Sequence, residues 1–211
     1  MHNNTDRDIH QPSTMTSENE WEQRYQSGKI GWDRGTSSHN LHHWLDSKQL
    51  KPCRIMVPGC GNGYEVITLA QQGFEVVCID IAVTAVDNLR AALAQRNLQA
   101  EVIHSDFFAL DFSSCSFDAI YEQTCLCALD PKQWPQFVQW MQQSLKTDGI
   151  LYSHFMQTHQ AGGPPFHCDM TEMHRLFTDT QWHWQFIDEA SQVNIQELKD
   201  KMEIPCMLTK R

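Results

Sequence analysis

Basic side chains are scarce in this 211-residue chain, which has 16 lysines and arginines against 26 aspartates and glutamates. The resulting formal net charge is −10, and the sequence contains no segment in which basic residues cluster into a stripe. Binding to a nucleic-acid backbone requires such a stripe, because most of the affinity comes from cations placed against phosphates. Nucleic acid is therefore not an expected partner.

Long apolar segments are also missing. No apolar run approaches the roughly 20 residues that span a bilayer as a helix. The N-terminal residues Met1–Asp6 are too polar for a signal peptide. We therefore expect no membrane association and a cytoplasmic location, with the eight scattered cysteines as reduced thiols and not a disulfide framework.

Recognisable metal and nucleophile motifs are absent. The eleven histidines form no His-Glu-x-x-His pattern, and the cysteines form no paired Cys-x-x-Cys units. No Ser/His/Asp or Cys/His arrangement stands out either. We therefore predict no metal and assign no catalytic residue.

What the sequence does contain is a regular alternation of strand and helix patterns. Alternation of this kind implies right-handed crossovers and a mainly parallel sheet with helices on both faces, which is an α/β fold of Rossmann-like type. The expected strands are 54–57, 75–79, 101–104, 117–121 and 149–155, and the expected helices between them are 64–72, 83–96 and 131–145.

The two ends of the chain depart from this alternation. Residues 1–17 are polar and nonperiodic, which predicts a disordered tail before a single domain over 18–211. Ser17 and Glu20 have the spacing of a capping box, so a helix is expected through Trp21 and Tyr25.

A second helix is expected at 39–46, before the strands begin. After a loop rich in glycine and proline, the sequence predicts a short helix at 170–177. Two final strands, at 183–188 and 203–208 with a loop near 192–201, should form an antiparallel hairpin at one edge of a sheet of seven strands.

The most informative motif joins the first two expected strands. The first strand runs into a turn containing Gly59, Gly61 and Gly63, a helix follows, and the second strand ends on Asp80. Glycines allow a sharp turn and close approach of a ligand, because they carry no Cβ. An acid at the end of the second strand is placed to accept hydrogen bonds from ribose hydroxyls. The motif predicts a nucleoside cradle, although Asp80 alone is equally suited to cap the next helix.

The residue after the turn limits the choice of cofactor. A dinucleotide fingerprint requires a small residue where this chain has Tyr64, and no Gly-Lys-Ser/Thr follows as in a Walker loop. S-adenosylmethionine, which has no pyrophosphate, fits the motif. A glycine turn that binds no ligand is the alternative.

The end of the third strand supplies a second nucleoside signal. Asp106 is placed to accept a hydrogen bond from the adenine amino group, and Phe107 to cover the ring. The same two residues are also suited to be a helix cap and a core side chain.

These motifs together make the chain resemble the thiopurine S-methyltransferase family, including its plant halide/thiol branch, from about Glu18 to Leu208. The most family-specific pieces are the N-terminal aromatic residues and the loop before the short helix. The motifs that carry the resemblance are Trp21-Glu-Gln-Arg-Tyr25 with Trp32-Asp33, Val57-Pro-Gly-Cys-Gly61, Asp80, Ser105-Asp106-Phe107 and Gly162-Gly-Pro-Pro-Phe166.

The resemblance implies a class I methyltransferase that uses S-adenosylmethionine, with an aromatic lid over the cofactor. The cofactor residues predicted with it are Trp21, Tyr25, Trp32, Gly59, Gly61, Asp80, Ser105, Asp106, Phe107 and Gln123. We also predict that the acceptor is contacted from the lid, from the end of the fifth strand and from the Gly-Pro loop, by Trp32, His154 and Phe166.

Two departures from the family pattern concern the acceptor. Thiopurine enzymes carry Arg, and the halide branch Tyr, where this chain has Gln123; Tyr25 stands where the family usually has Trp.

Our first hypothesis is methyl transfer by in-line displacement to a small thiol or thiopurine-like compound, by a monomer. The alternatives are halide, thiocyanate or selenium and tellurium oxyanions as acceptors, or a regulator that binds S-adenosylmethionine without catalysis. An O- or N-methyltransferase would need a base, for which His154 and His167 are candidates.

Overall fold

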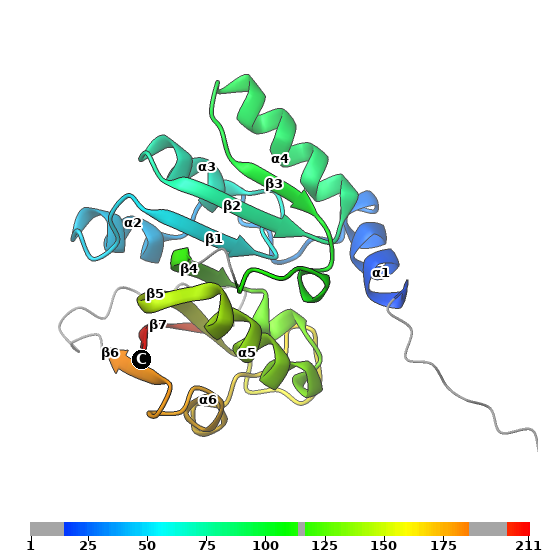
Figure 1. Ribbon diagram of the computed structural model, residues 1–211. Coiled ribbons are helices and arrows are strands. Elements are labelled where there is room, and N and C mark those ends of the chain that lie inside the picture. The colour runs from blue at the N-terminus through cyan, green and yellow to red at the C-terminus, as the bar shows by residue number, and fades with distance from the viewer. Residues whose placement is uncertain (1–14, 114–116, 186–201) are drawn as a thin grey trace, which may run out of the picture.

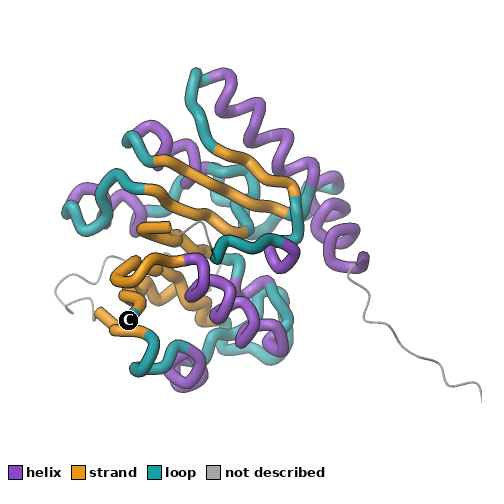
Figure 2. The backbone as a smooth tube through the Cα atoms, in the orientation of Figure 1, coloured by secondary structure: helices purple, strands orange, loops and turns teal. Residues whose placement is uncertain are grey.

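A computed structural model describes residues 15–113, 117–185 and 202–211 as one seven-stranded sheet with helices on both faces (Figures 1 and 2). The strand order is β3-β2-β1-β4-β5-β7-β6. Five strands are parallel, and β7 pairs antiparallel with both β5 and β6. The strands are β1 (Arg54–Pro58), β2 (Glu75–Asp80), β3 (Glu101–His104), β4 (Phe117–Gln123), β5 (Leu145–Gln157), β6 (Trp182–Gln185) and β7 (Met202–Lys210).

The helices lie where the sequence pattern predicts them. The six helices of the described residues are α1 (Met15–Gln26), α2 (His39–Asp46), α3 (Tyr64–Gln71), α4 (Val83–Gln95), α5 (Trp134–Ser144) and α6 (Met170–Leu176). Three short 3₁₀ turns accompany them: η1 (Phe107–Ala109), η2 (Leu126–Ala128) and η3 (Pro131–Gln133). The predicted Rossmann-like fold with a C-terminal antiparallel hairpin is thus confirmed.

Three elements start more than one residue away from the predicted position. Helix α1 begins at Met15, before the expected capping box. The helix expected over 131–145 is a 3₁₀ turn capped by the Asp130 carboxylate, which accepts the Lys132 N–H, followed by α5. Strand β5 begins at Leu145 because that residue pairs with Phe117 ahead of an irregularity in the register. The predicted hairpin loop near 192–201 lies outside the described residues.

Strand β1 shows why the central strands are apolar without interruption. Successive side chains of a strand point to opposite faces of its sheet. Met56 packs with Phe137 in the core under α5, whereas Ile55 and Val57 pack with Val66 in the core under α2, α3 and α4. Both faces are therefore covered, as parallel sheets require.

The topology places the candidate site at one edge of the sheet. Strands β1 to β5 are parallel, so their carboxyl ends lie together, where ligands of open α/β sheets bind. Strand β7 runs the opposite way, and its register pairs Glu203 with Met156 near the end of β5. The beginning of β7 therefore reaches the same edge. Helix α1 lies alongside this edge (Figure 1).

Among the described residues, no helix has both the length and the apolar character needed to cross a membrane.

Gly63 is expected to be the glycine whose replacement most disturbs the fold. Its φ is +72°, and a Cβ there would lie 2.3 Å from Leu89 Cδ1. Gly63→Ala combines a left-handed backbone with overpacking, so the free energy of unfolding should fall by about 2–5 kcal/mol. Gly73 has φ +86° and open space around it, so Gly73→Ala should cost only about 1–2 kcal/mol. Urea denaturation measures the free energy of unfolding of each variant. An equal loss in Gly63→Ala and Gly73→Ala would contradict the packing argument.

Candidate functional site

The glycine turn after β1 lets two other segments approach it closely. Gly59 has φ +59°, and a Cβ there would lie 2.8 Å from the Cys125 sulfur. Gly61 has φ +53°, and a Cβ there would lie 2.7 Å from the Tyr25 hydroxyl oxygen. Both positions therefore need glycine for conformation and for space.

The carboxylate of Asp80 ties this turn to the end of β2. Its Oδ2 accepts the Gly61 N–H at 2.7 Å, and its Oδ1 accepts the Ala82 N–H at 2.9 Å. Burial raises the pKa of Asp80, while these backbone hydrogen bonds oppose the rise. Asp80 thus caps the region before α4 and also lines a cavity, so the two interpretations of this residue hold together.

Three aromatic rings from α1 and the following loop pack together above the turn. The ring of Trp32 meets that of Trp21 at 5.3 Å and that of Tyr25 at 5.8 Å, both edge to face. All three rings line the cavity. Edge-to-face pairs stabilise such an arrangement by about 0.5–1.5 kcal/mol each. The rings form a preassembled aromatic lid.

Polar contacts hold the lid against the rest of the domain. Glu22 of α1 accepts hydrogen bonds from the N–H and hydroxyl of Thr84 in α4. Asp33, next to Trp32, accepts from the side chains of Asn62 and Tyr64 in and after the glycine turn. Tyr64, the residue that excluded a dinucleotide motif, thus has a structural role in anchoring the lid loop.

The cavity beneath the lid has a volume of about 750 Å³ and runs along the carboxyl ends of the strands. It brings together residues from the glycine turn, the ends of β2 to β5 and the Gly-Pro loop. Of the residues predicted from sequence, those that line it are Trp21, Tyr25, Trp32, Gly59, Gly61, Asp80, Asp106, Phe107, Gln123 and Phe166. Ser105 and His154 are not among the lining residues.

At the end of β3, Asp106 and Phe107 are both structural and exposed to the cavity. Asp106 caps η1 by accepting the Phe108 N–H at 2.9 Å through Oδ1. The ring of Phe107 packs 5.0 Å from Phe137 and 5.2 Å from Trp140. Ser105 donates its hydroxyl proton to the Asp106 carbonyl, which leaves its side chain engaged with the backbone.

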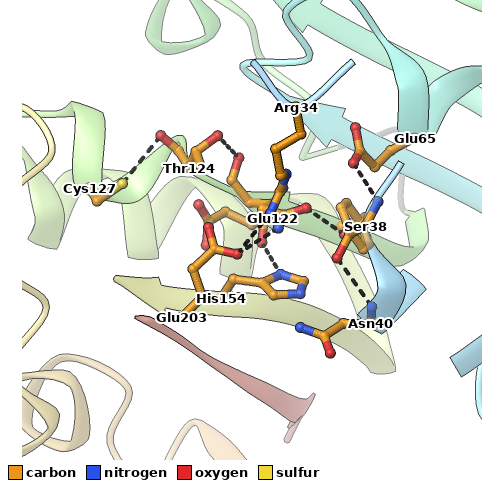
Figure 3. Close-up of polar contacts among 11 residues, drawn as sticks. Arg34, Ser38, Asn40, Glu65, Glu122, Thr124, Cys127, His154 and Glu203 are labelled. Carbon is orange, nitrogen blue, oxygen red and sulfur yellow. Dashed lines mark hydrogen bonds and ion pairs between the residues drawn. The ribbon is translucent and has the colours of Figure 1, made fainter. Parts of the chain in front are cut away.

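At the end of β4, Gln123 belongs to a buried polar chain, of which Figure 3 labels Arg34 and Glu203. Its Oε1 accepts the Tyr121 hydroxyl at 2.8 Å, and its Nε2 donates to Glu203 Oε2 at 2.7 Å. Arg34 reaches the same carboxylate oxygen at 3.3 Å from the lid loop, and it lines the cavity. The sequence analysis did not predict Arg34 or Glu203 as site residues. The one available signal was Glu203 itself, a lone acidic residue in the apolar final strand.

Glu122 faces away from the cavity. Its carboxylate accepts the N–H groups of Cys125 and Leu126 and the hydroxyl of Ser153. Burial raises its pKa, and these hydrogen bonds counteract the rise. Glu122 therefore caps the turn after β4.

His154 lies behind the cavity, buried to 1% exposure between the rings of Trp44 and Tyr121. Its Nδ1 is 3.2 Å from the Glu122 carbonyl oxygen, so Nδ1 carries the proton. Burial lowers the pKa of this imidazole. His167 lies against His159 and is likewise not among the lining residues. Neither histidine is placed to take a proton from a ligand in the cavity.

The residues present fit S-adenosylmethionine. Two glycines of the turn line the cavity, and Asp80 and Asp106 offer carboxylates at the ends of neighbouring strands for the nucleoside. The aromatic rings of the lid suit a sulfonium, since cations are attracted to ring faces. Among the described residues, no group of three or more His, Cys, Asp and Glu side chains could hold a metal ion.

Comparison with known proteins supports this fit. The thiopurine S-methyltransferase family profile matches residues 16–210. The chain is 30% identical over 171 residues to "Probable thiol methyltransferase 2" of Arabidopsis thaliana, covering 80% of this chain and 75% of that protein. It is 31% identical over 181 residues to the thiopurine S-methyltransferase of Xanthomonas euvesicatoria, covering 78% and 83% respectively.

A solved structure shows the same fold. The chain superposes on the 1,6-didemethyltoxoflavin-N1-methyltransferase of Burkholderia thailandensis with a TM-score of 0.71 at 16% identity. The match covers 98% of this chain and 93% of the other, which holds bound S-adenosylhomocysteine.

His154 should make stability depend on pH in the mildly acidic range. Its pKa is lowered in the folded state, so the unfolded chain binds the proton first as the pH falls below about 6.5. The free energy of unfolding should therefore decrease from pH 7.5 to 5.5, and His154→Gln should reduce that decrease. Urea denaturation at both pH values measures the free energy of unfolding. If it decreases by the same amount in wild type and in His154→Gln, the assignment is contradicted.

Proposed function

The chain belongs to the thiopurine S-methyltransferase family, and from this premise we propose that its methyl acceptor is a small thiol that reacts as the thiolate. The protein is an S-adenosylmethionine-dependent methyltransferase. Relatives named for thiol and thiopurine methylation support a sulfur acceptor. The observation that carries the proposal is the cavity lining, which includes no histidine among the described residues.

We assign the two ends of the cofactor to opposite ends of the cradle. Asp80 is placed for the ribose hydroxyls, and Asp106 with Phe107 for the adenine. Gly59 and Gly61 let the backbone approach the methionine end. Trp21, Tyr25 and Trp32 cover it from above, where each ring face near a sulfonium is worth about 0.5–2 kcal/mol.

The acceptor lies on the other side of the transferable methyl group. Met156, Pro165 and Phe166 line this part of the cavity and make it apolar. The Phe166 N–H donates to the Cys127 carbonyl at 2.7 Å, which fixes the loop in place. We propose that Trp32 and Phe166 contact the acceptor, and that His154 acts only through the packing of Tyr121.

The chemistry requires little more from the protein than position and exclusion of water. S-adenosylmethionine supplies an activated methyl group on a sulfonium. The lid and the Gly-Pro loop hold the acceptor in line with it, which is an effect of proximity and orientation. The same residues remove water from the reacting sulfur. A thiol with a pKa near 8.5 is partly ionised at neutral pH and needs no base, whereas an amine or alcohol would need one.

Cofactor binding should depend on Asp80. Titration of wild-type tryptophan fluorescence with S-adenosylmethionine and with S-adenosylhomocysteine should show saturable binding. Asp80→Ala should weaken the Kd about 10- to 100-fold, because a hydrogen bond to a charged group is worth about 1.5–3 kcal/mol. Asp118→Ala, which removes a partly exposed carboxylate paired with Lys146, is the control and should bind normally. No response of the wild type would refute the cofactor assignment.

Acceptor preference should follow the atom that takes the methyl group. With labelled S-adenosylmethionine, we expect turnover of thiophenol at least about 100-fold above that of phenol and aniline, because no histidine among the described lining residues is available to remove their protons. The rate with thiophenol should rise with pH until the thiol is ionised. A higher rate with phenol or aniline would contradict the thiol assignment. Cofactor binding without any turnover would instead indicate a regulator.

A further inference from the structure

Behind Gln123 lies a carboxylate that does not line the cavity. Glu203 of β7 has no exposed surface, and its Oε2 accepts from Gln123 Nε2 at 2.7 Å and from Arg34 at 3.3 Å. Gln123 and Arg34 both line the cavity. One buried oxygen thus holds two cavity-lining donors, which come from distant parts of the chain (Figure 3).

This arrangement fixes which way the Gln123 amide points. A carboxylate paired with a guanidinium can only accept hydrogen bonds, so the NH₂ end of Gln123 must face Glu203. The Tyr121 hydroxyl donates to the other end, at Oε1. One of the two N–H groups of the amide is used by Glu203. The second N–H is not used by Glu203, and Gln123 itself lines the cavity.

The position of β4 in the sheet determines which parts of the cavity lie on either side of Gln123. Strand β4 lies between β1, which carries the glycine turn, and β5, which leads to the Gly-Pro loop. Gln123 at its end therefore stands between the cofactor cradle and the acceptor side.

The other acidic side chains near this region accept hydrogen bonds from groups other than Gln123. Glu122 accepts two backbone N–H groups and the Ser153 hydroxyl. Glu65, which lines the cavity, accepts the Ser38 N–H at 3.0 Å. Among the described residues, Glu203 is the acid that bonds to the Gln123 side chain.

We propose that Glu203, with Arg34, is a positioning residue for methyl transfer: it turns the Gln123 N–H toward the reacting sulfur, so that the site selects a thiolate with concentrated charge. This inference rests on the proposed thiol acceptor. The thiol proton leaves to solvent before transfer. The thiolate sulfur then forms a bond to the methyl carbon, the bond from that carbon to the sulfonium breaks, and its electron pair stays on the cofactor sulfur.

The test compares two acceptors of similar shape, thiophenol and 4-nitrothiophenol. Charge is concentrated on sulfur in thiophenolate and delocalised into the ring in 4-nitrothiophenolate, so a hydrogen-bond donor favours the former. Glu203→Gln removes the obligatory acceptor and lets the Gln123 amide turn. The ratio of kcat/KM for thiophenol over 4-nitrothiophenol should fall about tenfold relative to wild type. The Kd for S-adenosylmethionine should stay within about twofold.

Ser153→Ala is the matched control, because it removes a buried hydrogen bond to Glu122 and leaves Gln123 untouched. It should lower both rates together, if at all, and keep the ratio. An unchanged ratio in Glu203→Gln would overturn the inference, as would a loss confined to cofactor affinity. A wild type that methylates neither thiol would refute the proposed function itself, so the two failures are distinguishable.

A second variant covers the case in which Glu203→Gln does not fold. Tyr121→Phe removes the donor to Gln123 Oε1 and leaves Glu203 and Arg34 in place. The amide is then held at one end only, and the same ratio should fall about two- to fivefold. A ratio equal to that of wild type in Tyr121→Phe would overturn the inference.

Discussion

The site depends first on the hydrogen bond between the Asp80 carboxylate and the Gly61 N–H. This bond joins the end of β2 to the turn after β1, and both strands contribute to the cofactor cradle. Because Gly61 has no Cβ, Tyr25 can approach the same turn from above. The floor and the lid of the cradle therefore meet at one residue. A side chain at position 61 would separate them.

The fold was predictable because its signals are local. Strand periodicity, glycine breaks and the alternation of elements gave most element positions, and the acid at the end of β2 gave the cradle. The start of β5 was not predictable, because it depends on Leu145 pairing with Phe117 across an irregular register. The same limit applies to α5, where Asp130 caps a 3₁₀ turn before the helix begins.

The candidate site was predictable only in part. The lining residues found from sequence lie in contiguous motifs, such as Trp21 to Tyr25. The buried chain behind Gln123 joins residues separated by 80 and 169 positions, and nothing local marks such pairs. His154 shows the opposite error: its place at the end of a strand suggested contact with the acceptor. Its strand position could not reveal that its ring lies between Trp44 and Tyr121.

Strand β7 runs antiparallel to its neighbours, so its beginning and not its end reaches the edge of the sheet that holds the cavity. A strand of the usual parallel direction would have carried Glu203 to the opposite edge. The late position of β7 in the chain also affects how the protein matures. The glycine turn, Asp80 and the lid have all left the ribosome long before Glu203 is synthesised. During synthesis, therefore, a nucleoside cradle can form on a nascent chain that still lacks the carboxylate behind Gln123, and its completion waits for the last strand to insert between β5 and β6.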